Sequence, residues 1–142
     1  MAANTTPIFP LTALTYPAAT VVSAANINRD GTGTVVLIWD PATDTDGSRV
    51  DYVRVIPTGT NIATVLRIFW NNGSDPTVAT NNTMVYERTM AATTISEVAE
   101  QPVQTIEIFP GGYVMPTLSR LYASVGTAIA SGLRVTCVGG TY

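Results

Sequence analysis

The chain has 142 residues, of which 46% are hydrophobic and only 12% are charged, and its formal net charge is −3. This length suits one domain with a single core, and the composition is too apolar for a disordered chain. The negative balance also disfavours a nucleic-acid partner, because Lys and Arg side chains must neutralise the phosphates.

The chain contains no His and no Lys, so that all seven basic residues are Arg. A His-based relay, an imidazole metal ligand and a lysine Schiff base are therefore excluded, and we expect no enzyme and no cofactor. The single cysteine, Cys137, lies in the apolar run "LRVTCVGG" and is predicted to be a buried hydrophobic residue. One thiol cannot form an intrachain disulfide.

The segment over residues 1–19 carries three prolines among Thr and Ala and predicts an extended N-terminal arm. Its apolar side chains are expected to pin it on a neighbouring surface: Ile8, Phe9, Leu11, Leu14 and Tyr16. It has no basic region typical of a signal peptide, and no window reaches the ~18 apolar residues of a bilayer span. We therefore expect no membrane partner and assembly in a cytoplasm.

Residues 20–142 are predicted to form one antiparallel β-sandwich, because short runs rich in Val, Ile, Thr and aromatic residues alternate with turns rich in Gly, Pro, Asn and Asp. With eight such runs, a jelly roll is the expected arrangement. The only candidate helix covers 91–100, where a loop is an equal alternative. The predicted strands are 20–25, 34–40, 49–56, 63–70, 83–88, 104–109, 118–125 and 133–138.

Strand 63–70 carries apolar side chains on both faces, so one face is expected to pack the core and the other to meet a subunit or partner. Arginines also lie within the predicted strands. They could pair across a subunit interface, where a planar donor is favoured, or within the chain with Asp51, Glu87 or Glu107. These arginines are Arg54, Arg67, Arg120 and Arg134.

The stretch "DPATDTDGSRVD", residues 40–51, gathers four of the ten acidic residues around Gly47: Asp40, Asp44, Asp46 and Asp51. When the stretch is aligned with an EF-hand-like calcium loop, Ala42 and Val53 stand at the first and last ligand positions. Neither side chain has an oxygen atom to bind calcium, so a polar hairpin is favoured over a metal site. Weak calcium binding remains the alternative. Asp51 is expected to pair with an Arg.

Two glutamates, Glu87 and Glu107, lie in predicted strands and could form a glycosidase pair only if they flanked one cleft. Cross-strand pairing with Arg is the favoured interpretation. The stretch "RDGTGTVV", 29–36, lacks the GK[ST] end of a phosphate loop and is predicted to be a turn that leads into a strand.

Several stretches together resemble a group of small tailed-bacteriophage virion proteins: "NRDGTGTVV", "GSRVDYVRVIPTGT", "VLRIF" and the C-terminal "VGGTY". The similarity runs from about residue 26 and is weaker over 71–103. The chain differs at Tyr52, where relatives often have a basic residue, and in a longer 71–83 loop. The resemblance implies a head decoration (cement) protein: a compact β-sandwich or jelly roll, often trimeric, outside an icosahedral capsid.

From this resemblance we expect a homotrimer on the capsid surface of a virion, bound to the major capsid protein through the apolar arm and the strand arginines. Such a protein clamps neighbouring capsid subunits by many repeated contacts and needs no catalytic group. The alternative is a tail-associated or carbohydrate-binding sandwich. That function would require exposed aromatic rings on one open surface, and the candidates are Trp70, Tyr86 and Tyr113.

Overall fold

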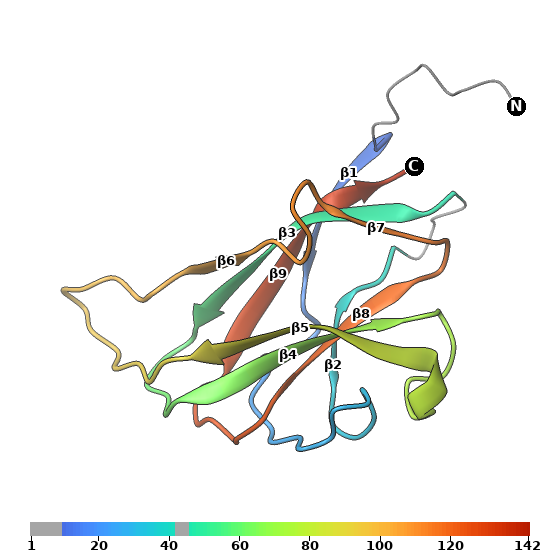
Figure 1. The fold of residues 1–142 in the computed structure, drawn as a ribbon. Helices are drawn as coiled ribbons and strands as arrows, with labels where there is room; N and C mark the ends of the chain where they lie inside the picture. Colours follow the sequence, from blue (N-terminus) through green and yellow to red (C-terminus); the bar gives the residue numbers. More distant parts are fainter. Residues whose placement is uncertain (1–9, 42–45) are drawn as a thin grey trace, which may run out of the picture.

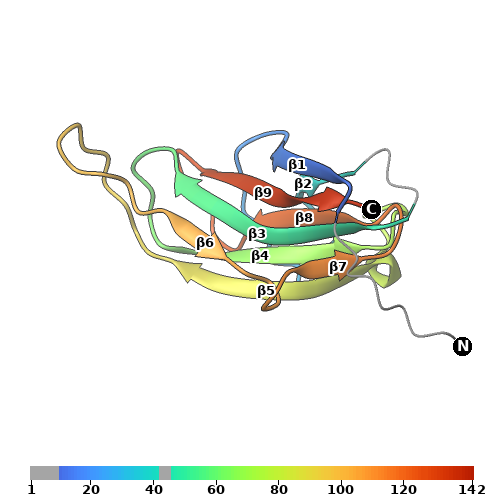
Figure 2. The same ribbon diagram turned by 90° about the horizontal axis from the view of Figure 1, so that it is seen from above.

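A computed structural model describes residues 10–41 and 46–142 as two antiparallel β-sheets packed face to face (Figures 1 and 2). The predicted all-β sandwich is confirmed. A single turn of 3₁₀-helix, η1 (Ala79–Asn81), interrupts the strands. No helix in the described part of the chain is long and apolar enough to cross a membrane.

Sheet A has the strand order β1-β9-β3-β6, and β7 pairs with the other end of β3. Sheet B has the order β2-β8-β4-β5. The strands of sheet A are β1 (Thr12–Pro17), β3 (Ser48–Pro57), β6 (Gln104–Ile106), β7 (Tyr113–Met115) and β9 (Leu133–Thr141). Those of sheet B are β2 (Val36–Trp39), β4 (Thr64–Asn71), β5 (Asn82–Met90) and β8 (Arg120–Val125).

Most predicted strands are confirmed with shifted ends, but some local predictions are wrong. Residues 20–25 contribute only isolated bridges instead of a strand. Residues 91–100 form a loop, which is one of the two alternatives left open for this segment. The predicted strand over 104–109 shortens to β6, and β7 was not predicted. Within the predicted arm, Thr12–Pro17 is the edge strand β1, paired over its whole length with β9.

The core lies between the sheets and follows the alternation of the strands. Val53 and Val55 of β3 and Leu66 and Ile68 of β4 belong to this one core, and all four side chains are fully buried. Cys137 of β9 belongs to the same core, as predicted, and burial raises the pKa of its thiol. The thiol is therefore inert and packs as a hydrophobic residue.

The other side of β4 is also buried, but not by a partner. Arg67 and Phe69, which alternate with the core residues, are 7% and 0% exposed. The segment that leads into β2 lies against this side, because Ala25 bridges to Val125 and the Asn26 carbonyl accepts a hydrogen bond from Arg67 at 2.9 Å. The chain itself thus occupies part of the face on which we expected a subunit.

Candidate functional site

Two of the four strand arginines predicted for an interface are engaged within the chain. Arg67 pairs across the sheet with Glu87 at 3.0 Å, as the intrachain alternative predicts. Arg120 forms an ion pair with Asp40 at 3.2 Å. Both guanidinium groups thus have an intrachain partner, and the interface role expected for these two residues stays a prediction.

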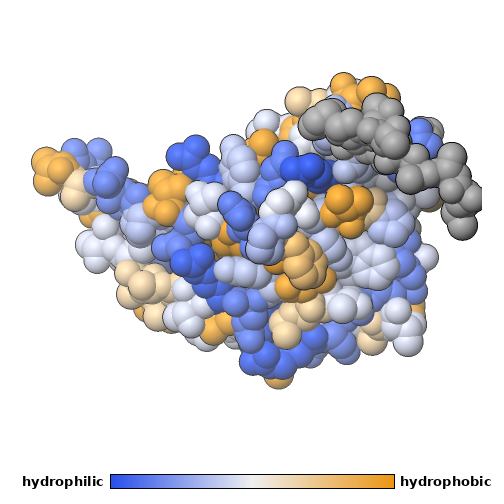
Figure 3. All heavy atoms as spheres, turned by 45° about the horizontal axis from the view of Figure 1, so that its top comes forward, coloured by the Kyte–Doolittle hydropathy of each residue, from blue (hydrophilic) through white to orange (hydrophobic). Residues whose placement is uncertain are grey.

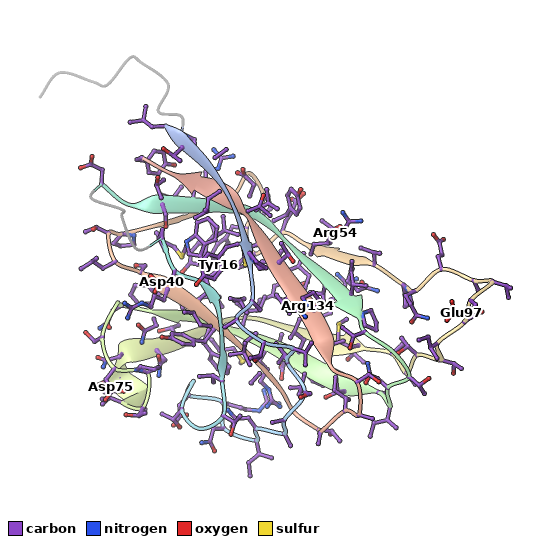
Figure 4. All side chains as sticks on the ribbon, turned by 180° about the vertical axis from the view of Figure 1, so that it is seen from behind. Tyr16, Asp40, Arg54, Asp75, Glu97 and Arg134 are labelled. Carbon is purple, nitrogen blue, oxygen red and sulfur yellow. The ribbon has the colours of Figure 1, made fainter. Side chains whose placement is uncertain are left out.

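Arg54 and Arg134 are different, because both are exposed and neither forms an ion pair with a described carboxylate. They lie on the outer face of sheet A, on β3 and β9, which are in front in Figure 4. The register places Ile56 opposite Arg134, and Tyr52 lies two residues before Arg54 on the same face. This face offers two cations beside half-buried apolar side chains.

An open depression of about 290 Å³ lies by the other end of β3. Its charged lining residues are Arg49, Asp51 and Glu107, and Tyr52 contributes a ring. Arg49 and Asp51 form an ion pair at 2.6 Å, so the predicted pairing of Asp51 with an Arg is confirmed. Paired donors and acceptors beside a ring can bind a polar small molecule.

The turn before β7 forms one wall of this depression. A Cβ on Gly112, which has φ of +100°, would lie 2.5 Å from the Arg49 Nε, so only glycine lets the backbone approach the guanidinium. Phe109 packs on Tyr113 with ring centroids 5.0 Å apart. Burial raises the pKa of Tyr113. The sequence reasoning missed Tyr52 and Phe109, although the "IFPGG" turn was a local signal for such a site.

The three aromatic residues considered for sugar binding do not meet on one surface. Trp70 and Tyr86 belong to β4 and β5 of sheet B, whereas Tyr113 belongs to β7 of sheet A. All three are half-buried and pack against the core. A platform made of these rings, which the carbohydrate alternative required, is not present.

The predicted arm, residues 1–19, contains strand β1, which begins at Thr12. Leu14 and Tyr16 are half-buried on β1, and the Tyr16 ring packs edge-on against Trp39 at 6.2 Å. Leu11 is 86% exposed just before the strand. Ile8 and Phe9 lie outside the described residues. Leu14 and Tyr16 thus stabilise their own chain, and removing residues 1–19 would remove a strand of sheet A.

The acidic stretch 40–51 contains the turn that was predicted at Gly47, which has φ of +102° and precedes β3. It is not a hairpin, because it connects β2 of sheet B with β3 of sheet A. Asp44 lies outside the described residues. Among the residues that the structure describes, no group of three or more His, Cys, Asp or Glu side chains could hold a metal ion.

Glu87 and Glu107 are not brought together, since Glu87 lies on β5 of sheet B and Glu107 lines the depression on sheet A. Glu87 instead accepts hydrogen bonds from Arg67 and Arg29, which lower the pKa of its carboxyl group.

Asp30 accepts hydrogen bonds from the backbone and hydroxyl of Thr32, so the predicted turn over 29–36 is confirmed.

We expect thermal stability to fall as the pH is lowered through the acid range. The native pKa of Glu87 lies below its ordinary value of 4.5, so the unfolded chain binds this proton more readily. The stabilisation is complete above the ordinary value and is lost as the pH falls through the native value. Circular dichroism melting between about pH 6 and pH 3 should show a shallower decline for Glu87→Gln than for the wild type. Equal slopes would contradict this role of Glu87.

Candidate surfaces for a partner among the described residues thus include the outer face of sheet A with Arg54 and Arg134 and the depression beside Arg49 and Asp51. The motif residues 28–33, in contrast, form the turn that packs beside β5. Comparisons with protein-family models, with curated protein sequences and with solved structures give no match.

Proposed function

We propose that the protein is a structural component of a bacteriophage virion that decorates the outer surface of an icosahedral capsid by binding the major capsid protein. The observation that carries this proposal is the free edge of β1. Among the residues that the structure describes, this strand pairs only with β9, and no charged residue occurs in the sequence between Pro10 and Asn28. An exposed uncharged edge strand offers unpaired backbone groups to a strand of another protein.

The edge of sheet B makes the contrast clear. Its edge strand β5 carries Glu87 and Arg88, and its register with β4 shifts at Val85. Charges, prolines and bulges are the devices by which proteins protect an edge against pairing. β1 has a regular register over all six residues and no charge, and its one proline, Pro17, is the last residue of the strand. The asymmetry supports a docking role for β1.

The strand order supports a jelly roll, which is a fold that viral capsid proteins use. If β6 and β7 count as one interrupted strand, each sheet has four strands, in the orders β1-β9-β3-β6/7 and β2-β8-β4-β5. In chain order, β1, β2 and β3 lie alternately in sheets A, B and A, and β8 and β9 lie in sheets B and A. Two intertwined Greek keys require such alternation.

The motifs that resemble phage virion proteins occupy positions that this fold needs. Gly47 turns the chain into β3, and a Cβ on it would lie 2.7 Å from the Met115 carbonyl oxygen. A Cβ on Gly140, in the C-terminal "VGGTY", would lie 2.6 Å from the Thr12 carbonyl oxygen of β1. Proteins with glycines at the same positions can therefore pack their strands equally closely. This supports a resemblance in fold between this chain and the phage virion proteins.

Co-sedimentation with empty capsids tests the proposal. We expect the wild-type protein to sediment with capsids and Thr15→Lys to bind at least tenfold more weakly, because a lysine on the exposed β1 edge opposes strand pairing. Thr89→Lys is the matched control, since Thr89 is an exposed threonine on the protected edge strand β5. Immunogold labelling of tails instead of heads, or equal binding by both variants, would contradict the proposal.

A second candidate is a tail-associated or carbohydrate-binding module, and the depression lined by Arg49, Asp51, Tyr52 and Glu107 is the observation in its favour. Charged hydrogen-bonding groups beside a ring suit a sugar. Glycan binding that Tyr52→Ala abolishes, with no affinity for empty capsids, would favour this function over capsid decoration.

A further inference from the structure

The β5–β6 loop, residues 91–103, projects from the sandwich at the end opposite the C-terminus (Figures 1 and 2). Loops of this length without regular structure commonly carry function. The loop is nevertheless held in shape at its base and tip. Thr93 exchanges two backbone hydrogen bonds with Asn61, at 2.8 and 3.0 Å, and the Ser96 hydroxyl accepts hydrogen bonds from the backbone N–H groups of Val98 and Ala99.

The tip of this loop presents a hydrophobic side chain between two carboxylates. Val98 is 97% exposed, more than any other large hydrophobic residue that the structure describes, and Ile95 is 55% exposed. Glu97 and Glu100 flank Val98, and neither forms an ion pair with a described residue. Figure 3 shows hydrophobic and hydrophilic groups side by side on the projection. Such a tip suits a partner surface that is both apolar and basic.

The outer face of sheet A has the complementary chemistry. Among the described residues, the arginines outside ion pairs are Arg54, Arg88 and Arg134, and two of these three share this face. Ile56 and Val138 are half-buried on the same face. In Figure 4, Arg54 and Arg134 lie on the front strands, while Glu97 lies far out on the loop. Every copy of the chain thus carries both surfaces that one contact requires, the loop tip and the outer face of sheet A.

We propose that the β5–β6 loop of one copy docks on the outer face of sheet A of a second copy, with Glu97 and Glu100 facing Arg54 and Arg134. Val98 would then lie against the apolar side chains between the arginines. A mutual exchange of loops gives a two-fold dimer, and a one-way contact that closes gives a ring. The contact uses arginines of β3 and β9 and no residue of β1, so it does not depend on a capsid role.

A charge-swap experiment tests this interface by sedimentation velocity. The wild type is expected to self-associate, and more weakly as salt screens the charges. Glu97→Arg with Glu100→Arg, and separately Arg54→Glu with Arg134→Glu, should each weaken self-association at least tenfold, because each variant faces itself with like charges. An equimolar mixture of the two variants should associate again, because each loop then meets a face of opposite charge.

The mixture also shows that both variants are folded, since association requires the two surfaces to be intact. Arg88→Glu is the matched control and should associate as the wild type does. Arg88 is exposed and forms no ion pair with a described residue, but it lies on β5 of sheet B. A wild type that remains monomeric, charge-reversed variants that associate unchanged, or a mixture that remains monomeric would each overturn the proposal.

Discussion

Replacing Trp39 with alanine is expected to lower the free energy of unfolding by about 3–5 kcal/mol, the cost of a large cavity in a packed core. Trp39 ends β2 and is fully buried. Its indole N–H donates a hydrogen bond to the Ser48 hydroxyl at 3.2 Å, and its ring contacts that of Tyr16. One side chain thus connects β2 of sheet B with the first residues of β3 and with β1 of sheet A.

Equilibrium unfolding in urea measures this loss, and two controls separate its parts. Ser48→Ala removes the hydrogen bond while it keeps the ring, so we expect a loss of about 1 kcal/mol or somewhat more for the buried partner left unpaired. Leu11→Ala changes a residue that is 86% exposed, and should lie within about 0.5 kcal/mol of the wild type. A loss for Trp39→Ala no larger than that for Ser48→Ala would show that the ring does not connect the sheets.

The central strands could be predicted from the sequence because their signals are local. In β3 and β4, core residues such as Val53 and Val55, or Leu66 and Ile68, alternate with residues of the other face, and turn residues bound each run. The pairing of Asp51 with an Arg was also accessible, because Arg49 lies two residues before Asp51 on one strand. Alternation and turn chemistry were sufficient for these elements.

The edges of the sheets required information from distant parts of the chain. β1 pairs Thr12 with Thr141, so the partner that makes this segment a strand lies at the other end of the sequence. Residues 20–25 have strand-forming side chains, yet Val22 and Ala25 bridge singly to Leu133 and Val125. Here the tertiary contacts override the local propensity. No local pattern reports such pairings.

The candidate surfaces were only partly predictable for the same reason. Arg54 and Arg67 have the same residue type and both lie in strands, yet one is exposed and the other is 7% exposed. The difference comes from the segment before β2, which covers Arg67 and leaves Arg54 open. The sequence left a helix and a loop equally open over residues 91–100, and the bridge between Thr93 and Asn61, which are distant in the sequence, fixes the base of the loop.

Replacing Arg67 with methionine is expected to lower the free energy of unfolding by about 2–3 kcal/mol, because hydrogen bonds to a charged group are lost inside the protein. Arg67 donates to the Glu87 carboxylate at 3.0 Å and to the Asn26 carbonyl at 2.9 Å. Methionine retains most of the apolar contact of the side chain but leaves the Asn26 carbonyl without this donor. Arg88→Met, on the exposed side of β5, should remain within about 0.5 kcal/mol of the wild type.

Hydrogen exchange locates the effect of Arg67→Met within the molecule. We expect faster exchange over residues 26–34, where Asn26 also donates from its side chain to the carbonyls of Thr32 and Thr34, and unchanged exchange in the centre of β9. Glu87→Gln keeps the bond from Arg67 to Asn26, so it should accelerate exchange in this segment less. If Arg67→Met left the segment as protected as in the wild type, the turn over residues 28–33 would be held by its own hydrogen bonds. Loss of protection in residues 26–34 alone would show that Arg67 holds this turn on sheet B. The sequence motif at residues 28–33 would then serve the fold and not a binding site.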